Sequence, residues 1–387
     1  MPHAAPDDLL LPAGGRLIHI GPHKTGTTAI QVAMSSARDD MAAHGAYYPK
    51  GPFRRRKAGW ALGLPGKPPG REFPIRHWEQ LVAEVREAGA ARVCVSDENF
   101  ARAKPDVVAR IVDDLGGEEP RVVAVARRLD RLLPSLWQER VKWGKLEDFE
   151  PWLERVLGDD PDDRQHRDLW QGHDFVGLVD RWTQVVDPER FTLVIGDESD
   201  RDQLFRVFSQ MLGLPPGVLK PDLTRSNHSL SWSESEVIRS LRDLYEDNGW
   251  SAPYAAANIH HVVDALRASG VRPTGPRTPP IPTWALDRMR EISDQRVAAV
   301  ASLPVPVIGD AESLRQTDEP VEQVRVEDLS LPLGLVTAVV EGALRGERSF
   351  DPPTPAPPAP VPEPREPSGR EWLRIGARKV RRRLSRS

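Results

Sequence analysis

The chain has 387 residues, which corresponds to two average domains or to one large α/β domain with appendages. Apolar residues make up 39% of it, enough for a core, and its 38 prolines are about twice ordinary usage, which points to linkers or tails. The single cysteine excludes an internal disulfide framework and a multi-cysteine metal site, and no apolar run approaches the ~18 residues that a membrane-spanning helix needs. The N-terminus has no basic segment typical of a signal peptide, so a cytoplasmic protein is predicted.

Charge is distributed unevenly along the chain. The formal net charge is −4, but residues 370–387 hold eight Arg or Lys and one Glu, a local net charge of +7, which leaves −11 for the rest. An acidic body argues against nucleic-acid binding, and a basic end favours one anionic partner there. On a helix this tail is amphipathic, which is typical of segments that lie on anionic bilayers. Peripheral attachment to the inner face of the plasma membrane through residues 370–387 is therefore predicted.

Short apolar runs alternate with segments of helical periodicity. The helical segments between the runs include residues 77–88, 106–115 and 169–186, and the apolar residues after Thr27 recur with the spacing of one helix face. This alternation predicts an α/β fold with a central parallel sheet and helices on both faces. The runs predicted as strands are Leu17–Ile20, Arg92–Val95, Arg121–Ala126 and Phe191–Ile195.

Composition divides the chain into five predicted parts. Residues 233–268 are predicted to form two helices and 283–301 another, whereas 352–367 are dominated by Pro, Ala and Glu, which favours an extended linker. The parts are a flexible N-terminus (1–14), an α/β domain (15–301), a weakly patterned extension (302–351), a Pro-rich linker (352–369) and the basic amphipathic tail (370–387).

The loop Gly21–Thr28, with the sequence GPHKTGTT, has the features of a phosphate cradle. A loop between the carboxyl end of a strand and the start of a helix leaves several backbone N–H groups directed at one place. Gly21 and Gly26 allow close approach of the main chain, Lys24 adds a positive charge, and hydroxyls follow in the first helical turn. The nucleoside-triphosphate pattern GxxxxGK[ST] is absent, because Lys24 precedes Gly26.

This loop resembles the 5′-phosphosulfate loop of the sulfotransferases that use 3′-phosphoadenosine 5′-phosphosulfate (PAPS). The resemblance covers about residues 15–235 and implies the P-loop nucleotide-hydrolase-like sulfotransferase fold. It also implies that Lys24 is catalytic, because it stabilises the bridging oxygen as sulfuryl leaves. The residues that the resemblance places around the 5′-phosphate are Gly21, His23, Lys24, Thr25, Gly26, Thr27 and Thr28.

Two further segments resemble the same family. The family reads the 3′-phosphate with an arginine at a strand end and a serine eight residues later, and Arg127 and Ser135 have this spacing. Arg128 is a competing arginine. Downstream, TRSNHSLS resembles a segment of bacterial members, which implies that Arg225 closes over the phosphates of the donor.

An acceptor hydroxyl or amine must lose a proton, so a base is needed. The segment VCVSDENF places Glu98 and Asp97 just past a strand, at the edge where α/β sheets bind ligands. Glu98 is the first candidate, Asp97 the second and His23 the third. No metal is predicted, because the chain shows no metal-ligand spacing.

The predicted function is therefore sulfuryl transfer from PAPS to a hydroxyl or amine, such as that of a glycan or a lipid-linked envelope component. Two alternatives stay open from the sequence. One is a catalytically silent, nucleotide-binding or membrane-tethered interaction module. The other is a P-loop kinase, which the missing GK[ST] disfavours.

Overall fold

In the computed structural model the chain forms two compact units, residues 1–348 and 349–387, and all described residues except Ser349 belong to the first. Within the described part, no helix is long and apolar enough to cross a membrane. The basic tail lies outside the described residues. These are 9–68, 70–117, 119–142, 147–222, 230–316 and 324–349.

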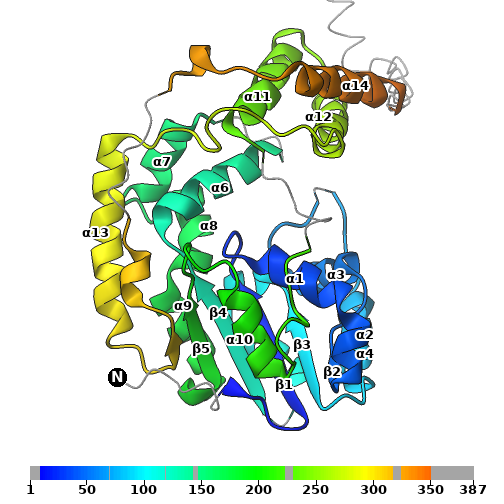
Figure 1. The fold of residues 1–387 in the computed structure, drawn as a ribbon, viewed down its shortest axis with the longest axis vertical. Helices are drawn as coiled ribbons and strands as arrows, with labels where there is room; N and C mark the ends of the chain where they lie inside the picture. Colours follow the sequence, from blue (N-terminus) through cyan, green and yellow to red (C-terminus); the bar gives the residue numbers. More distant parts are fainter. Residues whose placement is uncertain are drawn as a thin grey trace, which may run out of the picture. The chain divides into compact units, whose positions relative to one another are not determined.

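A six-stranded sheet with parallel strands forms the centre of the fold (Figure 1). Its order is β2-β3-β1-β4-β5-β6, so β1 lies between β3 and β4. The carboxyl ends of these three strands therefore meet at one edge, which is where open α/β sheets bind ligands. The strands are β1 (Gly15–Gly21), β2 (Ala46–Tyr47), β3 (Arg92–Ser96), β4 (Pro120–Ala126), β5 (Phe191–Ile195) and β6 (Val307–Ile308).

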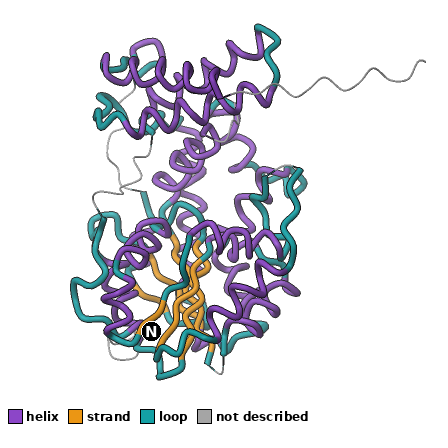
Figure 2. The backbone as a smooth tube through the Cα atoms, turned by 90° about the vertical axis from the view of Figure 1, so that its right-hand side faces the viewer, coloured by secondary structure: helices purple, strands orange, loops and turns teal. Residues whose placement is uncertain are grey.

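Both faces of the sheet are covered by helices, as Figure 2 shows edge-on, which confirms the predicted α/β class. Alternate residues of β4 belong to opposite cores, with Val122 and Ala124 on one face and Val123 and Val125 on the other. This two-sided burial explains why the strands are continuously apolar. One face packs against α4 (Arg76–Arg86), α5 (Pro105–Leu115) and α9 (Phe175–Thr183), and the other against α1 (Thr27–Ser36), α2 (Arg38–Ala43) and α10 (Gln203–Leu212).

A third core is made of helices and lies beyond the carboxyl edge of the sheet (Figure 1). Helix α13 (Thr283–Val300) contributes to this core near its start and packs against a sheet core near its end, so it joins the two regions. The remaining members are α6 (Leu129–Lys142), α7 (Phe149–Leu157), α8 (Arg164–His173), α11 (Trp232–Asp247), α12 (Ala252–Ala268) and α14 (Leu333–Ser349).

One predicted helix is divided in the structure. Residues 169–186 form the end of α8 and the whole of α9, with the break at Asp174, whose carboxylate accepts from the N–H of Val176 at 3.1 Å. An aspartate that caps a new helix competes with continuing the old one. Short elements complete the fold: α3 (Pro52–Ala61), η2 (Glu98–Arg102), η3 (Pro188–Arg190), η4 (Ala311–Leu314) and η5 (Val326–Asp328).

Candidate active site

The loop after β1 requires glycine at its first position. Gly21 has φ +85°, a left-handed value that side chains disfavour. A Cβ there would lie 2.8 Å from Cα of Glu98, which begins η2 after the neighbouring strand β3. Gly21 therefore lets the ends of β1 and β3 approach, and this contact places the loop beside the Glu98 segment.

The loop ends in an uncapped helix terminus. Lys24 and Gly26 both have left-handed backbones, with φ +65° and +93°, and Gly26 is the N-cap of α1 without a side-chain cap. The first turn of α1 holds no acid, and within the described residues the N–H groups of Gly26, Thr27 and Thr28 make no hydrogen bond. The positive end of the helix is therefore left for an anion.

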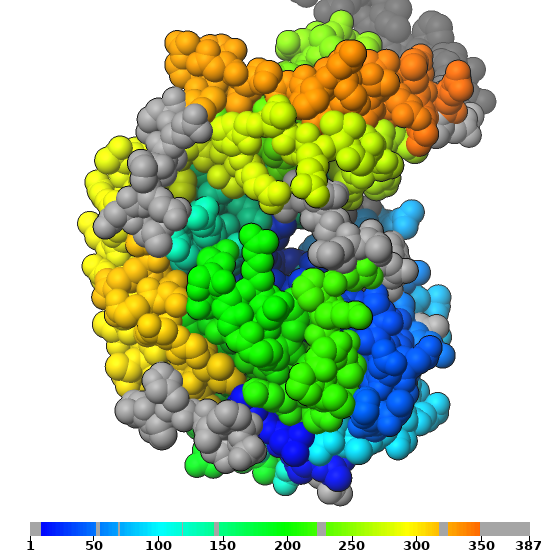
Figure 3. Space-filling view, viewed as in Figure 1, coloured from blue at the N-terminus to red at the C-terminus, as the bar shows by residue number. Residues whose placement is uncertain are grey.

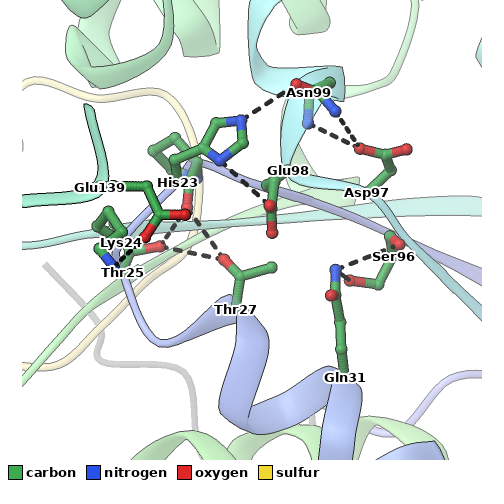
Figure 4. Close-up of polar contacts among 11 residues, drawn as sticks. His23, Lys24, Thr25, Thr27, Gln31, Ser96, Asp97, Glu98, Asn99 and Glu139 are labelled. Carbon is green, nitrogen blue, oxygen red and sulfur yellow. Dashed lines mark hydrogen bonds and ion pairs between the residues drawn. The ribbon is translucent and has the colours of Figure 1, made fainter. Parts of the chain in front are cut away.

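Hydroxyl groups brace this loop from inside. Thr25 Oγ1 and Thr27 Oγ1 both donate to the carbonyl oxygen of Pro22, at 2.8 and 3.0 Å, and both residues are buried (Figure 4). Thr28 is exposed at the start of the helix. The backbone of Thr25 and Thr27 can still face a phosphate, but their hydroxyls hold the loop in shape.

The side chain of Lys24 reaches helix α6. Lys24 Nζ lies 3.4 Å from Glu139 Oε2, and Lys142 Nζ lies 3.3 Å from the same oxygen. Burial lowers the pKa of Lys142, and the positive charge of Lys24 acts in the same direction, whereas Glu139 raises it. Glu139 thus joins the loop lysine to a second lysine. The space-filling view shows a hollow near the middle of the molecule, with atoms of the early chain, in dark blue, inside it (Figure 3).

Arg127 lies at the end of β4 and contacts the loop directly. Its Nη1 donates to the carbonyl oxygen of Lys24 at 2.9 Å, and its Nε and Nη2 both bind the carboxylate of Glu198, with Nη2 at 3.1 Å. Burial raises the pKa of Glu198, but the hydrogen bond and charge of Arg127 outweigh it, so the pKa is lowered. The structure therefore brings Arg127 and Lys24 together, with Arg127 paired to a carboxylate that follows β5.

The other candidates for the 3′-phosphate are placed differently. Arg128 is buried and forms two hydrogen bonds with Asp130, at 2.7 and 2.6 Å. Ser135 is half-buried on α6, and its hydroxyl makes no hydrogen bond within the described residues. Arg225 lies outside the described residues. Arg127 is thus the arginine that contacts the loop.

His23 is held between two side chains of η2. Asn99 Nδ2 donates to Asp97 at 3.0 Å, so Asn99 Oδ1 is the atom 3.1 Å from His23 Nε2, and His23 Nδ1 lies 3.1 Å from Glu98 Oε1. Both ring nitrogens therefore donate, as in an imidazolium. Burial lowers the pKa of His23, but Glu98 and Asn99 outweigh it and raise the pKa. Burial likewise raises the pKa of Glu98, but His23 dominates and holds it at about 2. Glu98 is thus the counter-ion of His23.

Asp97 is a buried carboxyl group with one satisfied oxygen. Its side chain caps η2, where Oδ1 accepts from the N–H of Asn99 at 2.9 Å. Within the described residues Oδ2 has no hydrogen-bond partner, and a Cβ on Gly59 of α3 would lie 3.1 Å from it. Burial, with Asp97 only 4% exposed, raises its pKa to about 6. This carboxyl group is enclosed between η2 and α3.

Sequence reasoning missed the acidic partners of the two cations, Glu139 and Glu198. A signal for the first exists, because Ser135, Glu139 and Lys142 are spaced four and then three residues apart, which places them on one face of α6. No comparable signal marks Glu198, since its pairing with Arg127 depends on β5 lying next to β4.

No protein-family model matches the chain, and a search of curated proteins finds no significant similarity. Among the described residues, no group of three or more His, Cys, Asp or Glu side chains is arranged to hold a metal ion. The interpretation of the site therefore depends on its residues and their geometry.

Proposed function

We propose that this chain is a PAPS-dependent sulfotransferase with the P-loop nucleotide-hydrolase-like sulfotransferase fold. The observation that carries the proposal is the loop Gly21–Thr28, which follows the central strand, presents uncapped N–H groups and holds Lys24 at its left-handed turn. Its sequence GPHKTGTT resembles the phosphosulfate loop of that family, and its place in the sheet is where α/β proteins bind ligands.

The proposed chemistry is an in-line displacement at sulfur. The N–H groups at the start of α1 would hold the 5′-phosphate of PAPS, and Lys24 would neutralise charge on the bridging oxygen as the sulfur–oxygen bond breaks. The acceptor, a hydroxyl or an amine, would attack from the opposite side.

Arg127 is proposed to bind the 3′-phosphate, together with Ser135 on the following helix. In the structure Arg127 binds Glu198 through two nitrogens, so the ligand would have to replace that carboxylate. Arg127→Ala is expected to weaken the binding of adenosine 3′,5′-bisphosphate far more than that of AMP. The loss should be roughly ten- to a hundred-fold, because a charge-assisted hydrogen bond contributes about 1.5–3 kcal/mol. Equal weakening of both ligands would show that Arg127 only holds the loop.

Donor binding and chemistry can be tested separately. Adenosine 3′,5′-bisphosphate should raise the melting temperature of the full chain, and ATP with Mg²⁺ should not, because the GK[ST] pattern for its phosphates and metal is absent. Stabilisation by ATP with Mg²⁺ alone would favour a P-loop kinase.

Lys24→Ala should reduce turnover of PAPS by at least about 10²-fold while the fold is kept, because the lysine neutralises charge that develops in the transition state. The exposed Lys104→Ala is the matched control. A folded Lys24→Ala protein with full activity would refute the mechanism. Binding of the bisphosphate without any turnover in the unaltered chain would favour the silent nucleotide-binding module.

A further inference from the structure

Glu139 is placed between the loop lysine and a second lysine on its own helix. Its Oε2 is 3.4 Å from Lys24 Nζ and 3.3 Å from Lys142 Nζ, as Figure 4 shows for the first contact. The exposed fractions of the three side chains differ: 8% for Lys142, 22% for Lys24 and 36% for Glu139. The buried lysine and the carboxylate are on the same helix, whereas Lys24 is on the loop.

This arrangement has a consequence when an anion binds at the loop. An anionic donor offers Lys24 a new partner, and the lysine side chain is long and flexible enough to change partners. Lys142 stays beside Glu139, one helical turn away on α6, and compensates its charge. The carboxylate of Glu139 therefore still has a cation beside it after Lys24 has turned to the donor.

The two carboxylates that follow β3 are less suited to accept a proton from an acceptor. Glu98 is bound to the His23 imidazolium, which holds its pKa at about 2. Asp97 is 4% exposed and faces α3. Glu139 is the most exposed of the three, and its carboxylate lies 3.4 Å from Lys24 Nζ on a different element, α6, from the N–H groups that would hold the 5′-phosphate.

We propose that Glu139 takes the proton from the acceptor and that Lys142 is the residue that keeps it in position. This inference rests on the proposed sulfotransferase function. An acceptor oxygen forms its bond to sulfur as the bond from sulfur to the bridging oxygen breaks. The electron pair of that bond goes to the 5′-phosphate beside Lys24, and the acceptor proton goes to the carboxylate of Glu139. The partly exposed carboxyl group then releases the proton to water.

The test uses radiolabelled PAPS, with water as the acceptor, and the full chain. Glu139→Gln should lower the rate of sulfate release by about 10²–10⁴-fold. It should not weaken the binding of adenosine 3′,5′-bisphosphate, measured by calorimetry. Added formate should restore part of the rate to Glu139→Ala, which a purely structural role would not allow. Lys142→Met should lower kcat and leave the bisphosphate affinity unchanged. Glu154→Gln and Lys104→Met, at exposed positions, should behave like the unaltered chain.

Each of the other outcomes contradicts a specific proposal. If Glu139→Gln turns over normally and binds the bisphosphate more tightly, Glu139 is only a counter-ion that competes with the donor, and the inference is wrong. Loss of bisphosphate binding in Glu139→Gln, or no effect of formate, also overturns it. If the unaltered chain binds the bisphosphate but releases no sulfate, Glu139 does not deprotonate water and the inference fails, while the proposed donor site stands. If it does not bind the bisphosphate, the proposed function itself fails.

Discussion

Replacing Asp97 by asparagine should change the free energy of unfolding more favourably at pH 8 than at pH 5. The group is enclosed, 4% exposed, and its Oδ2 has no hydrogen-bond partner among the described residues. Burial raises its pKa from the ordinary value of 3.8 to about 6. A carboxyl group whose pKa is raised by folding binds its proton more tightly in the folded state. The folded state therefore loses stability as the pH rises from about 4 to 6.

The size of the effect follows from the pKa shift. Each pKa unit corresponds to about 1.4 kcal/mol, so the shift amounts to about 3 kcal/mol over the whole titration. About half of this, about 1.4 kcal/mol, falls between pH 5 and pH 8. The amide in the Asp97→Asn variant cannot ionise, and its oxygen can still accept the N–H of Asn99, so the variant lacks this loss.

The assay is urea unfolding of both proteins at pH 5 and pH 8. Only the difference between the two pH values matters, because any fixed cost of the substitution cancels in it. Asp180→Asn, at an exposed position of α9, is the control and should show no such difference. An equal change in stability at both pH values for Asp97→Asn would refute the reasoning, since it would mean that Asp97 does not titrate in this range.

Three further predictions follow from the same region and from the tail. Gly21→Ala should lower the free energy of unfolding by about 1–3 kcal/mol, because the backbone is left-handed and the new Cβ would meet Glu98 Cα; a mutation with no effect in urea unfolding would contradict this contact. Glu98→Gln should lower the pKa of His23 in an NMR titration, because the carboxylate raises it; an unchanged midpoint would mean that the pair does not form. The full chain should float with anionic vesicles at low salt and a 1–350 truncation should not, because residues 370–387 carry the basic charge; equal flotation of both would exclude the tail as an anchor.

The central strands can be predicted because each one is buried on both faces. The predicted run Phe191–Ile195 has the same bounds as β5, and the other three predicted runs lie within β1, β3 and β4. The edge strands β2 and β6 are two residues long and give no such run. Their pairing is set by the neighbouring strand, not by their own composition.

Only the part of the candidate site whose residues are close in sequence can be predicted. Gly21, Lys24 and Gly26 are close in sequence, and their left-handed backbones suit the loop that these residues indicate. The spacing on α6 indicates that Glu139 and Lys142 are neighbours, but the pairing of Glu139 with Lys24 could not be predicted, because it depends on the packing of α6 over the sheet edge. Likewise, the imidazolium of His23 depends on Asn99, whose role follows from η2 and not from any motif.

Lys24 of the loop and Arg127 beside it are each paired with a carboxylate of the chain, and this sets what can bind there. Lys24 has Glu139 and Arg127 has Glu198 as partners, and all four side chains are partly exposed. A partly exposed lysine–carboxylate pair such as Lys24–Glu139 contributes about 0–1 kcal/mol. A hydrogen bond from a charged group to a ligand contributes about 1.5–3 kcal/mol. Exchange of the carboxylate for a phosphate is therefore favourable at Lys24, where the uncapped N–H groups of α1 also contribute. At Arg127 a phosphate would replace a carboxylate that is already bound through two nitrogens. A neutral ligand gains nothing from opening these pairs, so they favour anions, and ionic strength should weaken the binding that they permit.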